Sequence, residues 1–182
     1  MKKVLIVVDM QYDFITGALG TTEAQDILPL VAKKIKNYRN IGYPVYFTKD
    51  THKPNYLNTQ EGKNLPIEHC IIETRGWGIH ASLDPEYASG ILIKNTFGYP
   101  NWKEFFMKEE QIGIGSFDVK EIELIGVCTD ICVVSNALIL KSIFPEVKIT
   151  VDATCCAGTT PEKHKMALEV MKSCQINIIN AI

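Results

Sequence analysis

The sequence predicts an α/β fold of three layers, in which helices cover both faces of a mostly parallel, doubly wound sheet of about six strands. Short β-branched apolar runs alternate along the chain with segments whose apolar residues recur at helical spacing. The first run, 4-VLIVV-8, has no polar position, as expected for a strand buried on both faces. The length of 182 residues, with 46% hydrophobic and 22% charged, suits a single Rossmann-like domain over 1–182.

The first half of the chain continues with a helix, a strand, a long loop and another strand. Apolar residues recur at helical spacing over 27–38, and Gly42 is a suitable stop. Residues 43–48 (YPVYFT) predict the second strand and residues 91–93 (ILI) the third. The loop at about 50–88 is rich in Pro, Asn, His and Gly. Because loops of this length are either functional or disordered, and three of the four histidines lie here, we expect a functional loop.

The second half adds three strands and two helices. The strands are expected at 121–126 (EIELIG), 147–151 and 176–179 (INII), and the alternating charges of EIELIG leave its start open. Thr129 or Asp130 is expected to cap a helix that runs to about Ser142. Pro161 begins the other helix, because proline is favoured in a first turn. The buried face expected for this last helix carries Met166, Ala167, Val170, Met171 and Cys174.

Charge and hydropathy exclude several classes of partner. The formal net charge of −2 argues against nucleic-acid binding and against attachment to anionic membranes. No apolar run approaches the roughly 18 residues that a membrane span needs. The N-terminal apolar stretch ends after five residues at Asp9 and lacks a small-residue cleavage site, so we expect no signal peptide and a cytoplasmic protein.

Six cysteines need an explanation that suits a reducing compartment. Most are expected to be small buried residues, because structural disulfides are rare there and no C-x-x-C pair suggests a zinc site. The segment 125-IGVCTDICVV-134 raises four alternatives for its two thiols: a metal clip, a redox pair, two structural thiols or a catalytic cysteine. The six residues are Cys70, Cys128, Cys132, Cys155, Cys156 and Cys174.

Polar side chains and thiols follow four of the predicted strands, where sites form in open parallel sheets. They are Asp9 after the first strand, Asp50 and His52 after the second, Lys94 after the third, and Cys128 and Cys132 after the fourth. Each residue taken singly has an ordinary reading as a turn, surface or core residue. Since they gather at one edge of the sheet, we expect them to form one site.

Three of these residues supply what amide hydrolysis requires. A thiolate at Cys132 would be the nucleophile, and the helix start and the Lys94 ammonium would both lower its pKa. Asp9 could take the thiol proton and pass it to a departing amine. The turn between Gly126 and Cys132 would present backbone N–H groups to a developing oxyanion.

Five blocks carry a resemblance to a known family. They are 5-LIVVDMQYDF-14, 47-FTKDTH-52, 66-PIEHCIIETRGWGIH-80, 91-ILIKNTFG-98 and 126-GVCTDICV-133. In these the chain resembles the isochorismatase-like cysteine hydrolases, and among them the nicotinamidases. The resemblance implies that Cys132 is the nucleophile, Asp9 the general acid–base and Lys94 the positive member of a triad. It also implies a cis Val127–Cys128 peptide bond and an oxyanion hole made by the backbone N–H groups of Cys128 and Cys132.

A second cluster suits a metal ion. Asp50 and His52 are two residues apart and face the same way on an extended chain, and His69 lies farther along the loop. One carboxylate and two imidazoles suit a divalent transition metal with open positions, although a solvated turn with surface histidines is the alternative. Nicotinamidases have D-x-H followed by an H-C pair, which His69-Cys70 matches. The resemblance therefore implies a divalent metal, with zinc the leading candidate, that binds the pyridine nitrogen of nicotinamide.

The resemblance implies a small-molecule amide as substrate and a homo-oligomer, either a dimer or a tetramer. The reaction expected is hydrolysis of nicotinamide to nicotinic acid and ammonia through a thioester. The segment 94-KNTFGYPNW-102 departs from the usual pattern of nicotinamidases, which leaves the substrate open. The alternatives are a metal-independent hydrolase of another small amide or a ureido compound, and a non-enzymatic binding module. The aromatic residues expected to hold the substrate ring, each with an alternative role in packing, are Phe14, Trp77, Phe97 and Tyr99.

Overall fold

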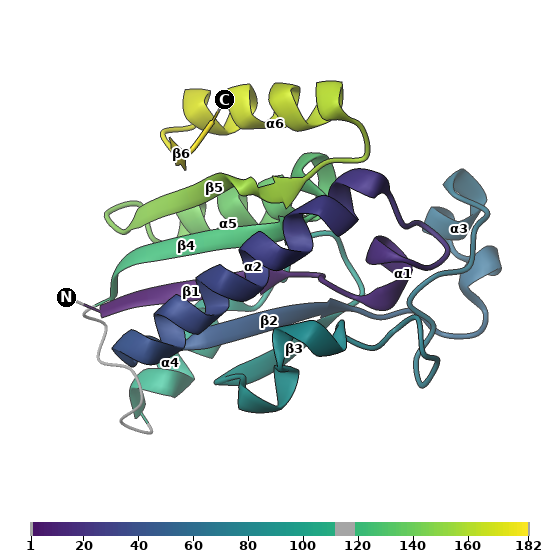
Figure 1. Cartoon of the computed structure of the whole chain (residues 1–182), viewed down its shortest axis with the longest axis horizontal. Helices are drawn as coiled ribbons and strands as arrows, with labels where there is room; N and C mark the ends of the chain where they lie inside the picture. The colour runs from purple at the N-terminus through teal and green to yellow at the C-terminus, as the bar shows by residue number, and fades with distance from the viewer. Residues whose placement is uncertain (1, 112–118, 182) are drawn as a thin grey trace.

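The computed structural model describes residues 2–111 and 119–181 and has the three layers that the sequence predicts (Figure 1). The strands are β1 (Lys2–Val8), β2 (Val45–Asp50), β3 (Gly90–Lys94), β4 (Val119–Val127), β5 (Lys148–Ala157) and β6 (Asn177–Ile179). The helices are α1 (Tyr12–Ile15), α2 (Thr22–Ile41), α3 (Gln60–Asn64), α4 (Trp102–Gln111), α5 (Val134–Ile143) and α6 (Pro161–Ser173). Four short helical turns are η1 (Tyr56–Asn58), η2 (Ala81–Leu83), η3 (Pro85–Tyr87) and η4 (Thr129–Val133).

The six strands form one sheet in the order β3-β2-β1-β4-β5-β6, and every described pair of neighbours is parallel. This order confirms the doubly wound α/β fold. The direction of winding reverses between β1 and β4, and such a switch point is where sites form in these sheets. The register there pairs Val8 with Gly126. Gly126 has φ +117°, and a Cβ on it would collide with the Val8 carbonyl, so only glycine lets the two strand ends approach so closely.

Helices cover the two faces of the sheet as separate layers. Figure 1 shows α2 crossing in front of the sheet and α5 behind it. Ile27, Val31 and Ile35 of α2 are buried on the front face, as their helical spacing predicts. The Thr21 side chain caps this helix by accepting from the Ala24 N–H at 3.0 Å. On the other face, α4, α5 and α6 supply Trp102, Leu140 and Met171 to a second apolar core.

The buried face of α6 differs from the prediction. Ala167, Leu168 and Met171 are buried. Met166 is 68% exposed, Val170 is 51% exposed and Cys174 is exposed, so the prediction was wrong for these three. Helical spacing allows either of two apolar pairs to be buried, 166/170 or 167/171, because each pair is four residues apart. The packing of α6 against η4 and α5 buries the pair 167/171.

The helix that carries the predicted nucleophile also begins differently. Cys128, and not Thr129 or Asp130, occupies the N-cap position. The Val133 N–H donates to the Cys128 carbonyl at 3.0 Å across five residues, which makes η4 a wide π-type turn before α5. Such turns are frequent at functional sites.

Other element ends shift without changing the fold. β2 ends at Asp50 and not at residue 48, and β5 continues to Ala157 instead of ending at residue 151. The long loop is irregular as predicted but contains η1, α3, η2 and η3. The short helix α1 and the helix α4 were not predicted.

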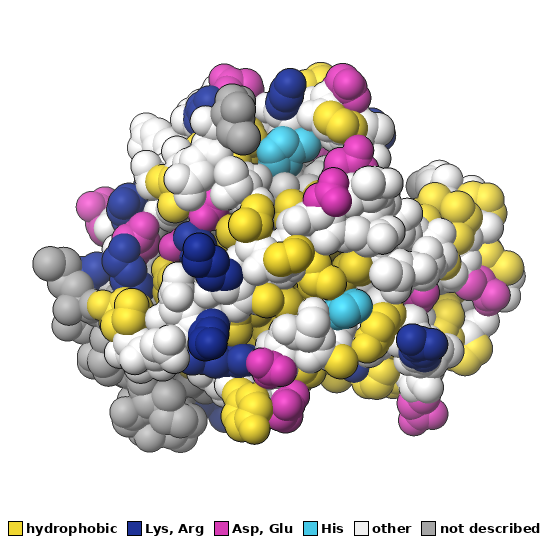
Figure 2. All heavy atoms as spheres, in the orientation of Figure 1, with side chains coloured by type: hydrophobic (Ala, Val, Ile, Leu, Met, Phe, Trp, Pro, Cys, Tyr) yellow, Lys and Arg dark blue, Asp and Glu magenta, His cyan; other side chains and the backbone are white. Residues whose placement is uncertain are grey.

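Charged side chains of both signs lie at the surface (Figure 2), and most of the thiols are buried, as the sequence predicts for the thiols. Acidic and basic side chains are mixed on the face in Figure 2, with hydrophobic side chains exposed between them. No helix in the described part of the chain has the length and apolar character to cross a membrane. All six cysteines are free, and four of them are buried.

Candidate active site

Three side chains predicted to carry the chemistry meet at the carboxyl edge of the sheet. Asp9 follows β1, Lys94 ends β3, and Cys132 lies in η4 directly after β4. The Lys94 Nζ atom lies 2.6 Å from Asp9 Oδ2 and 3.8 Å from Cys132 Sγ. The side chains of Asp9 and Lys94 have 0% exposure, and Cys132 is also buried. An acid, a base and a thiol are therefore enclosed together at the switch point of the sheet.

The backbone and one neighbouring hydroxyl fix the orientation of Asp9. Its φ of +50° lies in the left-handed region, which aspartate tolerates better than most residues. Its N–H donates to Thr48 Oγ1 at 3.2 Å, and the Thr48 hydroxyl donates to Asp9 Oδ1 at 2.7 Å. Oδ2 pairs with the Lys94 ammonium at 2.6 Å and has no further hydrogen-bond partner among the residues that the structure describes. This oxygen is therefore left with capacity to accept a proton.

Burial governs the charge states of the three groups. Burial raises the pKa of Asp9, the Asp50 charge adds to the increase, and Lys94 offsets only part of it. Burial alone would lower the pKa of Lys94, but the charges of Asp9, Cys132 and Asp50 raise it above its ordinary value. Burial, followed by the Asp9 charge, raises the pKa of the Cys132 thiol well above its usual range. This direction is opposite to the lowered pKa of Cys132 that the sequence suggested.

Hydrogen bonds within η4 and to α5 hold the backbone around Cys132 in place. The Ile131 and Val133 N–H groups both donate to the Cys128 carbonyl, at 3.1 and 3.0 Å. The Val127–Cys128 peptide bond is cis, as the family resemblance implied. The Ser135 hydroxyl donates to the Ile131 carbonyl at 2.6 Å and ties η4 to the first turn of α5.

The predicted metal ligands form a second buried cluster. One possible ligand atom from each of Asp50, His52 and His69 lies within 4.8 Å of the others. His52 Nε2 is 3.0 Å and His69 Nε2 is 3.7 Å from Asp50 Oδ2. The Ile67 carbonyl accepts from His69 Nδ1 at 2.8 Å, so Nδ1 carries a proton and the Nε2 lone pair faces the cluster. Two imidazole nitrogens and a carboxylate oxygen, all buried, fit a divalent transition metal.

Lys94 joins the two clusters into one site. Asp50 and Lys94 are register partners at the ends of β2 and β3. Lys94 Nζ lies 3.6 Å from Asp50 Oδ1 while it contacts Asp9 on its other side. Burial would raise the pKa of Asp50, but His52 and Lys94 lower it, so this carboxylate remains an anion facing both imidazoles.

Comparison with known proteins agrees with this geometry. The family of the Isochorismatase domain matches residues 3–182. The chain belongs to the isochorismatase family. A nicotinamidase/pyrazinamidase of Mycobacterium tuberculosis is 24% identical to it over 187 residues, which cover 97% of this chain and 98% of the relative.

Two solved structures are similar over the whole of this isochorismatase-family chain. The crystal structure of a pyrazinamidase of Pyrococcus horikoshii in complex with zinc has a TM-score of 0.81, is 29% identical and covers 100% of both chains. The crystal structure of an N-carbamoylsarcosine amidase of Thermoplasma acidophilum has a TM-score of 0.77, is 25% identical, and covers 100% of this chain and 99% of that one. The chain is therefore an isochorismatase-family hydrolase similar to amidases.

Sequence reasoning missed two residues next to Asp9 that hold the metal cluster. The Gln11 amide accepts from the Asp50 N–H at 2.7 Å and donates to the Asp50 carbonyl at 2.8 Å. The Asp13 carboxylate accepts from the N–H of Cys70, the neighbour of His69, at 2.7 Å. The alternation of polar residues in 9-DMQYD-13 after a strand indicated that these side chains face the same edge. It could not identify their partners, which are 39 and 57 residues away in the sequence.

A third missed residue, Glu61, comes from α3. Its Oε1 atom lies 3.6 Å from His52 Nε2 and 3.9 Å from His69 Nε2. Its side chain is 26% exposed, so it faces the cluster from the side nearer to solvent. No periodic pattern in the loop indicated that a short helix would place it there.

The four aromatic residues predicted to hold a substrate take different positions. The Phe14 ring is buried, with its centroid 5.5 Å from that of His69. Phe97 is 50% exposed. The Tyr99 ring packs against Trp102 with the centroids 5.0 Å apart. Trp77 has one ring face covered by the Lys49 ammonium, 2.9 Å from the ring centroid. Phe14 thus contacts a residue of the metal cluster.

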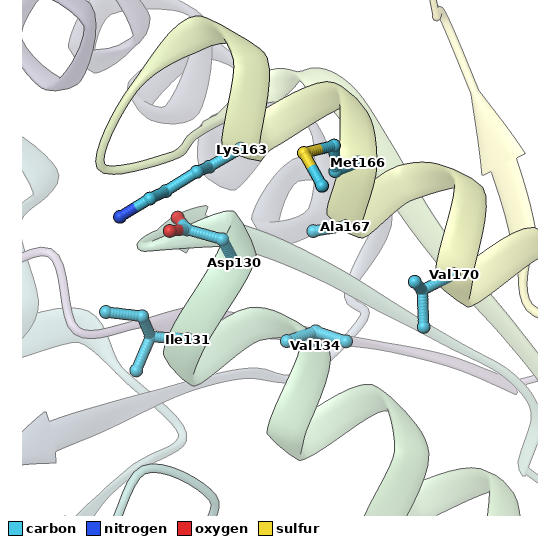
Figure 3. A pocket seen from close by; sticks show the side chains of 7 residues that line it. All are labelled: Asp130, Ile131, Val134, Lys163, Met166, Ala167 and Val170. Carbon is cyan, nitrogen blue, oxygen red and sulfur yellow. The ribbon is translucent and has the colours of Figure 1, made fainter.

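A separate groove lies beside η4, between it and α6 (Figure 3). It has a volume of about 510 Å³ and is lined by Asp130, Ile131, Val134, Lys163, Met166, Ala167 and Val170. None of the triad or metal-cluster residues belongs to this lining. The Thr159 N–H and hydroxyl donate to the Asp130 carboxylate at 2.8 and 2.6 Å, which ties η4 to the loop before α6.

Proposed function

We propose that the protein is a metal-dependent cysteine amidohydrolase that converts nicotinamide to nicotinic acid and ammonia. The observation that carries the proposal is the continuity of the site. Lys94 contacts Asp9 and Cys132 on one side and Asp50 of the Asp–His–His cluster on the other. A carboxamide attacked at the thiol would therefore have its ring close to the metal ligands.

In the first half of the proposed reaction, Cys132 Sγ forms a bond to the carboxamide carbon while Asp9 takes the thiol proton. Because burial raises the pKa of the thiol, and because the Asp9 carboxylate and the thiol contact the same ammonium, attack and proton transfer are proposed to be coupled. The Lys94 ammonium stabilises the negative charge that passes between the thiol and the carboxylate. The N–H groups of Cys128 and Cys132 are proposed to stabilise the oxyanion of the tetrahedral intermediate.

The second half releases both products. The C–N bond breaks as Asp9 returns its proton to the nitrogen, which leaves as ammonia and leaves a thioester on Cys132. Water then attacks the thioester carbon and gives a proton to Asp9. The C–S bond breaks, the carboxylic acid departs, and the sulfur regains its proton from Asp9.

Asp50, His52 and His69 would hold the metal, with Glu61 as a further donor within reach. Bound there, a zinc or other divalent ion supplies a Lewis acid that attracts a ring nitrogen and fixes the orientation of the substrate. The similarity to a pyrazinamidase solved with zinc supports this part of the proposal. The contact of Phe14 with His69 supports its role beside the substrate ring, and Phe97, Tyr99 and Trp77 remain predictions for that role.

The alternative is a metal-independent hydrolase of another small amide or a ureido compound. The similarity to an N-carbamoylsarcosine amidase favours it, since the chain covers that structure almost completely. A panel of nicotinamide, pyrazinamide and N-carbamoyl compounds distinguishes the two when ammonia release is measured before and after dialysis against a chelator. Nicotinamide turnover that is lost with the metal and restored by zinc supports the first proposal. Full activity of the metal-free protein, or turnover of ureido compounds alone, supports the alternative.

The proposal includes a homo-oligomer, a dimer or a tetramer, as the family resemblance implies. It also includes a single domain and a cytoplasmic location, as the chain length and the N-terminal stretch predict. Light scattering after size-exclusion chromatography measures the mass in solution. A mass equal to that of the 20.4 kDa chain contradicts the oligomer.

A further inference from the structure

The segment 49–52, which carries Asp50 and His52 of the metal cluster, has side chains on two opposite faces. β2 ends at Asp50, and the chain stays extended to His52, whose N–H donates to the Cys70 carbonyl at 2.9 Å and whose carbonyl accepts from the Ile72 N–H at 2.9 Å. Side chains alternate along an extended chain. Because Asp50 and His52 face the metal cluster, Lys49 and Thr51 face the opposite way.

A single indole contacts both of these rear-facing side chains. Trp77 Nε1–H donates to Thr51 Oγ1 at 2.7 Å. The Lys49 Nζ atom lies over the same ring, 2.9 Å from its centroid, which is a cation–π contact. Trp77 is partly buried against the apolar core under α2. The indole therefore lies along the back of the segment whose front holds the metal ligands.

The backbone of Trp77 is tied to the same segment. The Gln11 side-chain amide donates to the Trp77 carbonyl at 2.9 Å and to the Asp50 carbonyl at 2.8 Å. One buried amide thus sets the distance between the backbone that carries the indole and the backbone that carries Asp50. These bonds keep the backbone of Trp77 beside the segment that carries Asp50.

We propose that Trp77 is a positioning residue that holds Asp50 and His52 in their metal-binding orientation, acting through Thr51 and Lys49. Thr51 lies between the two ligands in sequence, so its hydrogen bond restrains rotation of the backbone on both sides. The role differs from stacking on a substrate, because Lys49 covers one face of the ring and Thr51 takes its N–H group. The proposal rests on the metal site of the proposed function and not on the identity of the amide.

The test is the zinc affinity of the metal-free full-length protein, measured by competition with a chromogenic chelator. Trp77→Phe keeps an aromatic ring but removes the N–H donor. Thr51→Val keeps the shape but removes the acceptor, together with the hydrogen bond that the Thr51 hydroxyl donates to the Lys49 carbonyl at 3.1 Å. Each is expected to weaken zinc binding about threefold to tenfold, which is at or below the low end of the roughly 10–100-fold effects of direct outer-shell partners, because Trp77 acts through Thr51. The zinc affinity of the double variant should equal the lower of the two single-variant affinities, because both substitutions break the hydrogen bond between Trp77 and Thr51.

Thr154→Val is the matched control, since the Thr154 hydroxyl also makes a partly buried hydrogen bond, to Asp152 Oδ1 at 2.8 Å. It should lower the melting temperature without changing zinc affinity. Unchanged zinc affinity in Thr51→Val and Trp77→Phe, or effects that multiply in the double variant, would overturn the proposal. If Trp77→Phe does not fold, Thr51→Val alone decides between the outcomes.

The assay separates this proposal from the proposed function because it contains no amide. Zinc binding by the wild type, weakened as expected in the two variants, supports the positioning role even if no amide is hydrolysed. A wild-type protein that binds no zinc overturns the positioning role together with the metal site, and ammonia release then shows whether the hydrolase proposal survives alone.

Discussion

Replacing Lys94 by Met removes a fully buried cation that lies between two buried carboxylates. The Nζ atom lies 2.6 Å from Asp9 and 3.6 Å from Asp50, with 0% side-chain exposure. Removing one partner of a buried ion pair typically costs about 3–5 kcal/mol, because the remaining charge has no compensation. We expect Lys94→Met to lower the free energy of unfolding by about that amount at pH 7, measured by urea denaturation.

The same substitution should reduce the rate of ammonia release. If about 3 kcal/mol of the lost interaction is felt in the transition state, the rate falls about 150-fold. Lys34→Met is a matched control, because Lys34 also bridges two carboxylates, Glu123 and Asp152, each at 2.7 Å. The Lys34 side chain is 21% exposed, so we expect Lys34→Met to lower the free energy of unfolding by about 1–3 kcal/mol. The folded variant should keep its rate of ammonia release. A Lys94→Met protein with wild-type stability and turnover would refute the reasoning.

Three further predictions concern single residues. Cys128→Ala should lose less than about threefold in rate, because its proposed contribution is a backbone N–H group that the substitution keeps. Glu61→Gln should weaken zinc binding about tenfold in chelator competition, because it removes a charge near His52. Burial raises the pKa of Asp152, but hydrogen bonds, first that of Lys34, lower it below its usual value. The stability from this group is therefore present above pH about 3.9 and lost below it, so the difference in unfolding free energy between wild type and Asp152→Asn should shrink from pH 7 to pH 3.

Each of these has an outcome that contradicts it. A large loss of rate in Cys128→Ala would give that thiol a part in the chemistry. Zinc affinity in Glu61→Gln equal to that of the wild type would place Glu61 outside the metal site. A difference between wild type and Asp152→Asn that does not change with pH would show that the carboxylate titrates alike in the folded and unfolded chains.

The layers and the location of the site could be predicted because they depend on local patterns. The apolar run 4–8 and its alternation with helical segments determine the fold class. The rule that sites form beyond the carboxyl ends of parallel strands then places Asp9, Lys94 and Cys132 at one edge, where the structure has them in contact.

What could not be predicted depends on contacts between distant parts of the chain. Helical spacing allowed two faces for α6, and only packing against η4 and α5 selects the one that leaves Met166 exposed. Gln11 and Glu61 act on partners in other elements, so no motif spacing reveals them. The raised pKa of Cys132 follows from its burial, which the pattern of residues around it does not show.

The most direct test of the central claim is the rate of ammonia release from nicotinamide by zinc-loaded wild type and Cys132→Ala. The matched control is Cys156→Ala, which removes another buried thiol that lies outside the triad and the metal cluster. The account predicts ammonia release by the wild type and by Cys156→Ala, and none above background by Cys132→Ala. Equal release by Cys132→Ala and wild type would contradict a thioester mechanism at this residue.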